Sequence, residues 1–206
     1  MTADVSALRK QMRERRRTLA AAERIAAAER IADRLLALPA MPRRGYVAGY
    51  WAVDGEVGLH AWQLRLADTL TYCLPVLHDD GRLRFAPWRP GAPLVSNRYG
   101  IPEPDVAPDA LLDAQAMACV IAPVVAFDAA GHRLGMGGGW YDRSFAFRRE
   151  RTVAALLVGA AYAIQQLDAI VAQPWDIALD AVCTERDTFV HAALLQGQPH
   201  QDPNSA

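Results

Sequence analysis

Lysine is almost absent from this chain. Of the 22 basic residues only Lys10 is a lysine, and the others are arginines. Several enzyme classes need a lysine at a defined place: after the glycines of a P-loop, on an early strand of a protein kinase, or buried in a pyridoxal enzyme. Lys10 lies in the charged stretch "RKQMRERRR", which suits none of these sites. The composition therefore excludes all three classes.

Cysteine, long apolar runs and excess charge are also scarce. The three cysteines, Cys73, Cys119 and Cys183, are far apart in apolar surroundings, which predicts buried thiols rather than disulfides or a metal site. No run of about 18 uncharged apolar residues occurs, and the first residues are charged where a signal peptide would be apolar. A net charge of −1 does not indicate the broad basic surface that binds nucleic acid. We expect a cytoplasmic monomer that acts on small molecules, with no membrane or nucleic-acid partner.

The first part of the chain has a helical composition. Residues 4–38 are rich in Ala, Leu, Arg and Glu and contain no Gly or Pro, so they predict a helical segment that bends near Thr18. The apolar residues expected on its buried side are Leu8, Met12, Leu19, Ile25, Leu35 and Leu36.

Short apolar runs follow and indicate an α/β fold. The runs at 46–53, 70–77, 82–88, 118–127 and 152–162 predict strands, and helices are expected within 56–68, 141–150 and 163–172. The prolines of residues 89–113 predict a long loop without regular structure. The alternation indicates a single-domain open, largely parallel sheet with helices on both faces. We expect this domain over residues 1–195, with residues 1–38 as its N-terminal helical segment and 196–206 as a flexible tail.

The stretch "RLGMGGGWYDR", residues 133–143, is the strongest functional motif. It follows the best central strand, where open α/β sheets bind ligands. Its four glycines let backbone N–H groups converge on a phosphate at the start of the next helix, and Arg133 and Arg143 add charged donors. Trp140 occupies the last position of a G-x-G-x-x-G pattern, so a dinucleotide fingerprint is not supported. The alternative is a glycine-rich turn that only reverses the chain.

Several motifs in succession resemble the 5-formyltetrahydrofolate cyclo-ligase family. They are "LRKQMRERRRTLAAAER", "YWAVDGEVGLHAW", "LPVL", "YGIPEP", "APVVAFDAAGHRLGMGGGWYDR" and "VGAAYAIQQLDAIVAQPWDIALDAVCTE", which cover nearly the whole chain in order. The resemblance implies a fold similar to the NagB/RpiA/CoA-transferase group. It also implies ATP- and Mg²⁺-dependent conversion of 5-formyltetrahydrofolate to 5,10-methenyltetrahydrofolate, with release of ADP and phosphate.

The resemblance also implies roles for individual residues. Arg133, Tyr141 and Asp142 would be catalytic, and Asp142 and Asp180 would hold the metal. The ATP-binding residues would be Arg9, Arg133, Leu134, Gly135, Met136, Gly137, Gly138, Gly139, Trp140 and Tyr141. The folate-binding residues would be Trp51, Glu56, Met136, Gly137, Gly138, Gly139 and Trp140.

Structural roles are the alternatives for several of these residues. Asp142 suits a helix start, Asp180 a turn, Glu56 a solvated first helical turn and Trp51 the core.

One position departs from the family pattern: Val5 stands where the family usually has a lysine at the ATP site. The substitution leaves open a non-catalytic folate-binding or regulatory paralogue. A sugar-phosphate or CoA-handling enzyme is a third alternative, by fold analogy alone.

Overall fold

The computed structural model describes residues 2–150 and 155–191. The tail expected over 196–206 lies outside these ranges, as do residues 152–154 of the last expected strand. Within the described ranges, no helix has both the length and the apolar character needed to cross a membrane.

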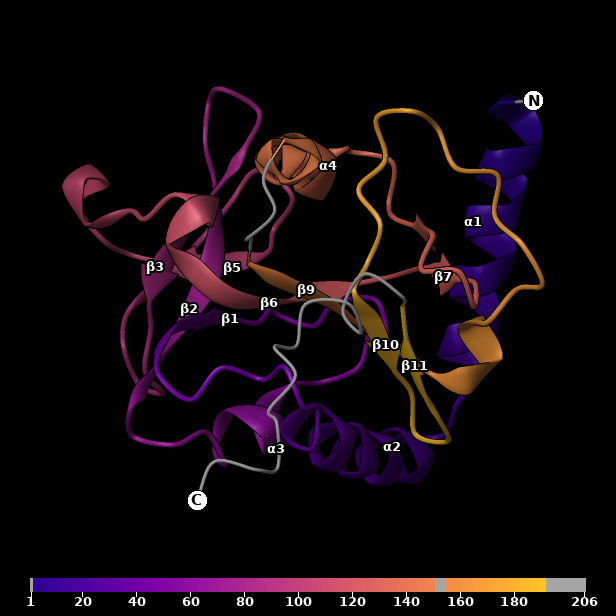
Figure 1. Ribbon diagram of the computed structural model, residues 1–206, viewed down its shortest axis with the longest axis horizontal. Coiled ribbons are helices and arrows are strands. Elements are labelled where there is room, and N and C mark those ends of the chain that lie inside the picture. The colour runs from indigo at the N-terminus through magenta and orange to yellow at the C-terminus, as the bar shows by residue number, and fades with distance from the viewer. Residues whose placement is uncertain (1, 151–154, 192–206) are drawn as a thin grey trace, which may run out of the picture.

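A seven-stranded sheet with the order β11-β10-β9-β6-β1-β2-β3 forms the centre of the fold (Figure 1). Its parallel strands are β1 (Gly45–Ala48), β2 (Leu70–Leu77), β6 (Met117–Pro123), β9 (Leu156–Ala160) and β10 (Ala181–Cys183). The edge strands β3 (Leu83–Pro87) and β11 (Thr188–Val190) are antiparallel to their neighbours. The largely parallel sheet is confirmed, and each of the five expected runs contains most or part of a strand: β1, β2, β3, β6 and β9. The runs at 46–53 and 118–127 were too long, because β1 ends at Ala48 and β6 at Pro123. Strands β10 and β11 were missed because each has only three residues.

Two small antiparallel ribbons accompany the sheet. One pairs β4 (Leu94–Ser96) with β5 (Pro102–Pro104), and the other pairs β7 (Ala126–Phe127) with β8 (Arg133–Leu134). The expectation of no regular structure over 89–113 was therefore wrong. Proline is tolerated in β5 because a short edge strand does not need every backbone N–H.

The two N-terminal helices, α1 (Thr2–Arg17) and α2 (Ala21–Leu36), confirm the expected bend near Thr18. Met12 and Leu35 are buried as expected, and Leu8, Leu19 and Leu36 are partly buried. Ile25 was placed wrongly, since its side chain is 67% exposed. The buried face of α2 instead includes Ala27, Ile31 and Leu35, which are spaced four residues apart.

The remaining helices are short. They are α3 (His60–Gln63), α4 (Trp140–Ser144) and the 3₁₀ turns η1 (Pro108–Ala110), η2 (Ala114–Ala116), η3 (Ala146–Arg149) and η4 (Ala163–Gln165). The helix expected over 163–172 was wrong beyond η4. There the Leu167 N–H donates to the Phe127 carbonyl, so the chain pairs with β7 and does not continue as a helix.

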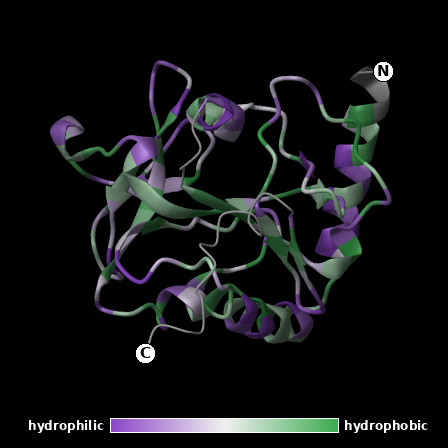
Figure 2. Cartoon of the chain, viewed as in Figure 1, coloured by the Kyte–Doolittle hydropathy of each residue, from purple (hydrophilic) through white to green (hydrophobic). Residues whose placement is uncertain are grey.

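Hydrophobic clusters cover both faces of the sheet. Along β6, Cys119 and Ile121 belong to the cluster beneath α2 and α3, whereas Val120 and Ala122 belong to the cluster beneath α4 and η3. Figure 2 shows hydrophobic residues gathered along the central strands. The three cysteines are buried and unpaired, as expected.

The sheet has a topological switch point between β1 and β6. The chain leaves β1 toward β2 on one side and later returns to place β6 on the other side. Open α/β sheets bind ligands beyond the carboxyl ends of the strands at such a point. The segments after β1 and β6 are therefore where a site is expected.

Candidate active site

The glycine-rich segment lies between β8 and α4. Gly137 and Gly139 have φ values of +95° and +65°, which disfavour residues with a Cβ. A Cβ at Gly138 would lie 2.7 Å from the Trp140 ring. A Cβ at Gly135, in contrast, would meet no described protein atom within 4 Å. A simple chain-reversing turn explains the last three glycines but not Gly135, which leaves open space beside the loop.

Helix α1 holds this loop from one side. The Arg9 Nε–H donates to the Gly135 carbonyl at 2.9 Å, and the Arg9 guanidinium carbon is 3.5 Å from where a Gly137 Cβ would lie. Leu134 is buried in a cluster with Met12 of α1, whereas Met136 is 53% exposed. Arg9 and the glycine loop, both predicted to bind ATP, are therefore in direct contact.

Arg133 and Asp142 form an ion pair at the start of α4. Arg133 Nη2 donates to Asp142 Oδ1 at 2.6 Å, and the Ile177 N–H donates to the same oxygen at 3.0 Å. Arg133 also donates to the Ile177 carbonyl. Asp142 Oδ2 has no hydrogen-bond partner within the described parts of the chain. Asp142 is thus a first-turn acid of α4 with one carboxylate oxygen that has no partner among the described residues.

Asp180 has a different environment. Its Oδ1 accepts from Arg148 Nη2 at 2.5 Å, and its Oδ2 accepts from the Leu157 N–H at 2.7 Å. Both oxygens are therefore engaged by the protein. In the described ranges, no three acidic, histidine or cysteine side chains are grouped around a common metal position.

Glu56 lies in the segment after β1, and its side chain is 7% exposed. Its Oε2 accepts from the Val53 N–H at 3.1 Å, and its Oε1 is 3.8 Å from Arg16 Nη1. Burial raises the pKa of Glu56, although the Val53 hydrogen bond and the Arg16 charge oppose that rise. Helix α3 begins only at His60, so the interpretation of Glu56 as a solvated first-turn residue was wrong.

Tyr141 connects the two parts of the site. Its ring stacks on Phe145 of the core with centroids 6.3 Å apart. Burial is the largest cause of its raised pKa, and the negative charge of Glu56 is the next, while Arg133 opposes both. The charges of Glu56 and Arg133 therefore both act on Tyr141, although the three residues come from segments far apart in the sequence.

Two tryptophans were predicted to contact the folate. Trp51 is 37% exposed and packs edge-to-face with Trp88, with ring centroids 5.9 Å apart, so it is not a buried core residue. The guanidinium carbons of Arg98 and Arg143 lie over the Trp140 ring, 5.1 and 5.3 Å from its centroid. Trp140 thus has a cationic environment, and Trp51 an aromatic one.

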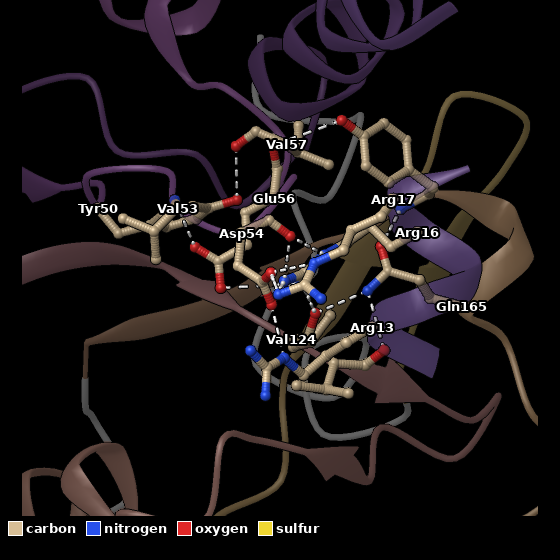
Figure 3. A network of polar contacts seen from close by, with 12 residues as sticks. Arg13, Arg16, Arg17, Tyr50, Val53, Asp54, Glu56, Val57, Val124 and Gln165 are labelled. Atoms are coloured by element: carbon tan, nitrogen blue, oxygen red, sulfur yellow. Dashed lines mark hydrogen bonds and ion pairs between the residues drawn. The ribbon is translucent and has the colours of Figure 1, made fainter. Parts of the chain in front are cut away.

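A polar network beside Glu56, shown in Figure 3, was not predicted from the sequence. Arg13, Arg16 and Arg17 of α1 all contact Asp54, which has a left-handed φ of +54°. Burial alone would raise the pKa of Asp54, but the arginine hydrogen bonds and charges outweigh it and lower that pKa. Helical spacing was the available signal, because Arg16 follows Arg9 by seven residues and shares its helix face.

Comparison with known proteins supports one family. Residues 1–185 match the 5-formyltetrahydrofolate cyclo-ligase family. The chain is 35% identical to the 5-formyltetrahydrofolate cyclo-ligase of Escherichia coli K12 over 84% of this chain and 96% of the relative. It is 30% identical to that of Mycolicibacterium smegmatis over 90% and 95% of the two chains. The solved structure of Aquifex aeolicus 5,10-methenyltetrahydrofolate synthetase superposes with a TM-score of 0.76 at 28% identity, covering 97% of each chain. The chain therefore belongs to the 5-formyltetrahydrofolate cyclo-ligase family.

Proposed function

We propose that the protein converts 5-formyltetrahydrofolate to 5,10-methenyltetrahydrofolate at the expense of ATP, releasing ADP and phosphate. The observation that carries this proposal is that helix α1 contacts both the glycine loop and Glu56: Arg9 donates to the Gly135 carbonyl at 2.9 Å, and Arg16 Nη1 lies 3.8 Å from Glu56 Oε1. The relatives named above bear the corresponding enzyme names.

The chemistry needs positioning and charge neutralisation more than a protein nucleophile. The formyl oxygen attacks the γ-phosphate and ADP leaves, which gives an imino-phosphate. The nitrogen of the aminobenzoyl arm then attacks the former formyl carbon, the ring closes, and phosphate departs. Arg9 and the N–H groups of the glycine loop would bind the nucleotide phosphates. The Glu56 carboxylate would accept two N–H bonds from the pterin, and Arg133 would hold Asp142 in place.

The residues at the start of α4 suit a phosphate-bound Mg²⁺ ion. Magnesium is usually held by one or two carboxylates together with phosphates and water, so a cluster of three protein ligands is not required. Asp142 offers one oxygen without a partner among the described residues, whereas both oxygens of Asp180 already accept hydrogen bonds. Bound Mg²⁺ would neutralise the charge that develops on the phosphates. We therefore propose Asp142 as the principal metal ligand and Asp180 as a second, weaker one, because both of its oxygens already accept hydrogen bonds.

The direct test mixes purified protein, Mg-ATP and 5-formyltetrahydrofolate and follows the near-ultraviolet absorbance of the methenyl product. We expect absorbance to rise only when both ATP and Mg²⁺ are present. A flat trace from a protein that still binds the folate would replace the proposal with the non-catalytic paralogue.

Val5→Lys tests the position that departs from the family pattern. Val5 is 37% exposed and lies one helical turn before Arg9, so a lysine there would reach toward the same phosphates. We expect the KM for ATP to fall several-fold and kcat to stay within a factor of about two, an effect on the order of 1 kcal/mol. Steady-state kinetics at varied ATP measures both. An unchanged KM would mean that position 5 does not face the nucleotide, and a large rise in kcat would mean that the parent protein had lost catalysis.

We also propose that the enzyme works in the cytoplasm as a monomer and without a nucleic-acid partner, as the composition suggests. Sedimentation velocity at micromolar concentration would reveal any dimer.

A further inference from the structure

Arg16 is fully buried beside the site, with a relative exposure of 0%. Its Nε and Nη2 donate to the Asp54 carbonyl at 3.1 and 2.8 Å. Its Nη1 is 3.8 Å from Glu56 Oε1 and donates a long hydrogen bond of 3.5 Å to the Val124 carbonyl. One guanidinium therefore connects α1 to the segment after β1 and to the segment after β6 (Figure 3).

Burying a guanidinium is costly unless its charge and its donors are satisfied, and an apolar side chain in such a place is often equally stable. Arg13 and Arg17 already pair with Asp54 from more exposed positions, with side chains 34% and 53% exposed. Asp54 thus has two other cationic partners. What Arg16 adds is contact with Glu56 and Val124. It is the only basic side chain within ion-pair distance of Glu56 among the described residues.

We propose, on the basis of the function proposed above, that Arg16 is a positioning residue for the folate end of the site. It holds the segment that carries Glu56 at the switch point and keeps the Glu56 carboxylate charged for the pterin. Because Arg9 contacts the glycine loop from the same face of α1, this helix ties the positions of the two substrates together.

The charges around Glu56 make this role measurable. Burial is the largest influence and raises the pKa of Glu56, the Arg16 and Arg13 charges lower it, and the Asp54 charge raises it. Burial raises the pKa of three tyrosines and the Glu56 charge adds to that rise: Tyr50 of the same segment, and Tyr141 and Tyr162 of other segments. Removing the Arg16 charge should raise the pKa of Glu56 further. If folate binding needs the Glu56 carboxylate, binding should then be lost at a higher pH than in the wild type as the solution is acidified.

The experiment compares Arg16→Gln, whose amide can still donate to the Asp54 carbonyl, with Arg16→Lys, which keeps the charge. Arg17→Gln is the matched control. Arg17 lies on the same helix as Arg16 and pairs with Asp54, but the ion pairs of the described residues do not include one between Arg17 and Glu56. The pKa of Glu56 is read by carbon NMR of glutamate-labelled protein, with the signal assigned by its loss in Glu56→Gln. The pH dependence of 5-formyltetrahydrofolate binding is followed by tryptophan fluorescence, and steady-state kinetics gives the KM for each substrate.

We expect Arg16→Gln to move the Glu56 pKa and the acid limb of folate binding upward by about one pH unit. On that limb the KM for folate should rise about tenfold, which corresponds to the same unit, while the KM for ATP stays within a factor of about two. Arg16→Lys should keep the Glu56 pKa and the KM for folate close to their wild-type values, and Arg17→Gln should leave both unchanged.

Two results would overturn the role of Arg16: a folded Arg16→Gln protein with unchanged Glu56 pKa and acid limb, or an equal shift in Arg17→Gln. If Arg16→Gln does not fold, Arg16→Met supplies an uncharged, apolar side chain of about the same length as glutamine. A wild-type protein without cyclo-ligase activity would instead refute the proposed function, and the NMR comparison would still decide whether Arg16 controls Glu56.

Discussion

Asp142→Asn is expected to lower kcat by at least about 100-fold, or roughly 2.7 kcal/mol of transition-state stabilisation. The amide has nearly the size of the carboxylate but no negative charge. It can still accept the hydrogen bonds from Arg133 and from the Ile177 N–H at Oδ1. The position that offers an oxygen to Mg²⁺ would be neutral, so the metal requirement should rise together with the loss of turnover. Steady-state kinetics at a series of Mg²⁺ concentrations measures both effects.

Loss of folding must be separated from loss of chemistry in this variant. The Arg133 side chain is only 6% exposed, so replacing its carboxylate partner should cost about 1–2 kcal/mol of stability and leave the protein folded. Thermal melting checks this expectation. Full activity of Asp142→Asn at ordinary Mg²⁺ levels would reduce Asp142 to a helix-start acid that holds Arg133.

Asp180→Asn is the matched variant for the metal site. Both oxygens of Asp180 accept hydrogen bonds from Arg148 and the Leu157 N–H, so the substitution should lower stability more clearly than turnover. A fall in kcat and a rise in Mg²⁺ requirement equal to those of Asp142→Asn would show that Asp180 has a comparable role in metal binding.

Glu56→Gln should weaken 5-formyltetrahydrofolate binding by about 1–3 kcal/mol, or roughly 5- to 150-fold, while ATP binding stays close to normal. The amide oxygen can still accept from the Val53 N–H, so the local backbone should hold. What is lost is the negative charge that we propose as the acceptor of two N–H groups of the pterin. Separate titrations with the folate and with a non-hydrolysable ATP analogue measure the two affinities.

The pH dependence of folate binding provides a second measurement on Glu56. Burial raises the pKa of Glu56, so the carboxylate is lost at a higher pH than for an ordinary glutamate as the solution is acidified. Wild-type affinity should therefore fall as the pH drops through this raised pKa, and Glu56→Gln should remove that limb. If ATP binding weakens instead and folate binding holds, the two ends of the site are assigned in reverse.

Local pattern was sufficient for the elements that carry strong periodicity. The helical segment with its bend near Thr18 and the strand over 70–77 are present as expected. The predictions that Ile25 is buried and that residues 163–172 form a helix were wrong for the same reason. Which face of a helix is buried, and whether a weakly helical stretch stays helical, depends on the neighbours that it meets. The Leu167 N–H is such a case, because it pairs with Phe127 of β7.

The sequence by itself determined the fold class and the family, because apolar periodicity and the succession of motifs are written along the chain. It also identified the glycine loop, Asp142 and Glu56 as candidates. Only the tertiary structure decided that Glu56 is buried next to Arg16, that Asp180 has both oxygens engaged and that Asp142 keeps one oxygen without a partner among the described residues. The physical reason is that burial, pKa and hydrogen bonding depend on groups brought together from distant segments. The order of residues specifies these neighbours only through the completed fold.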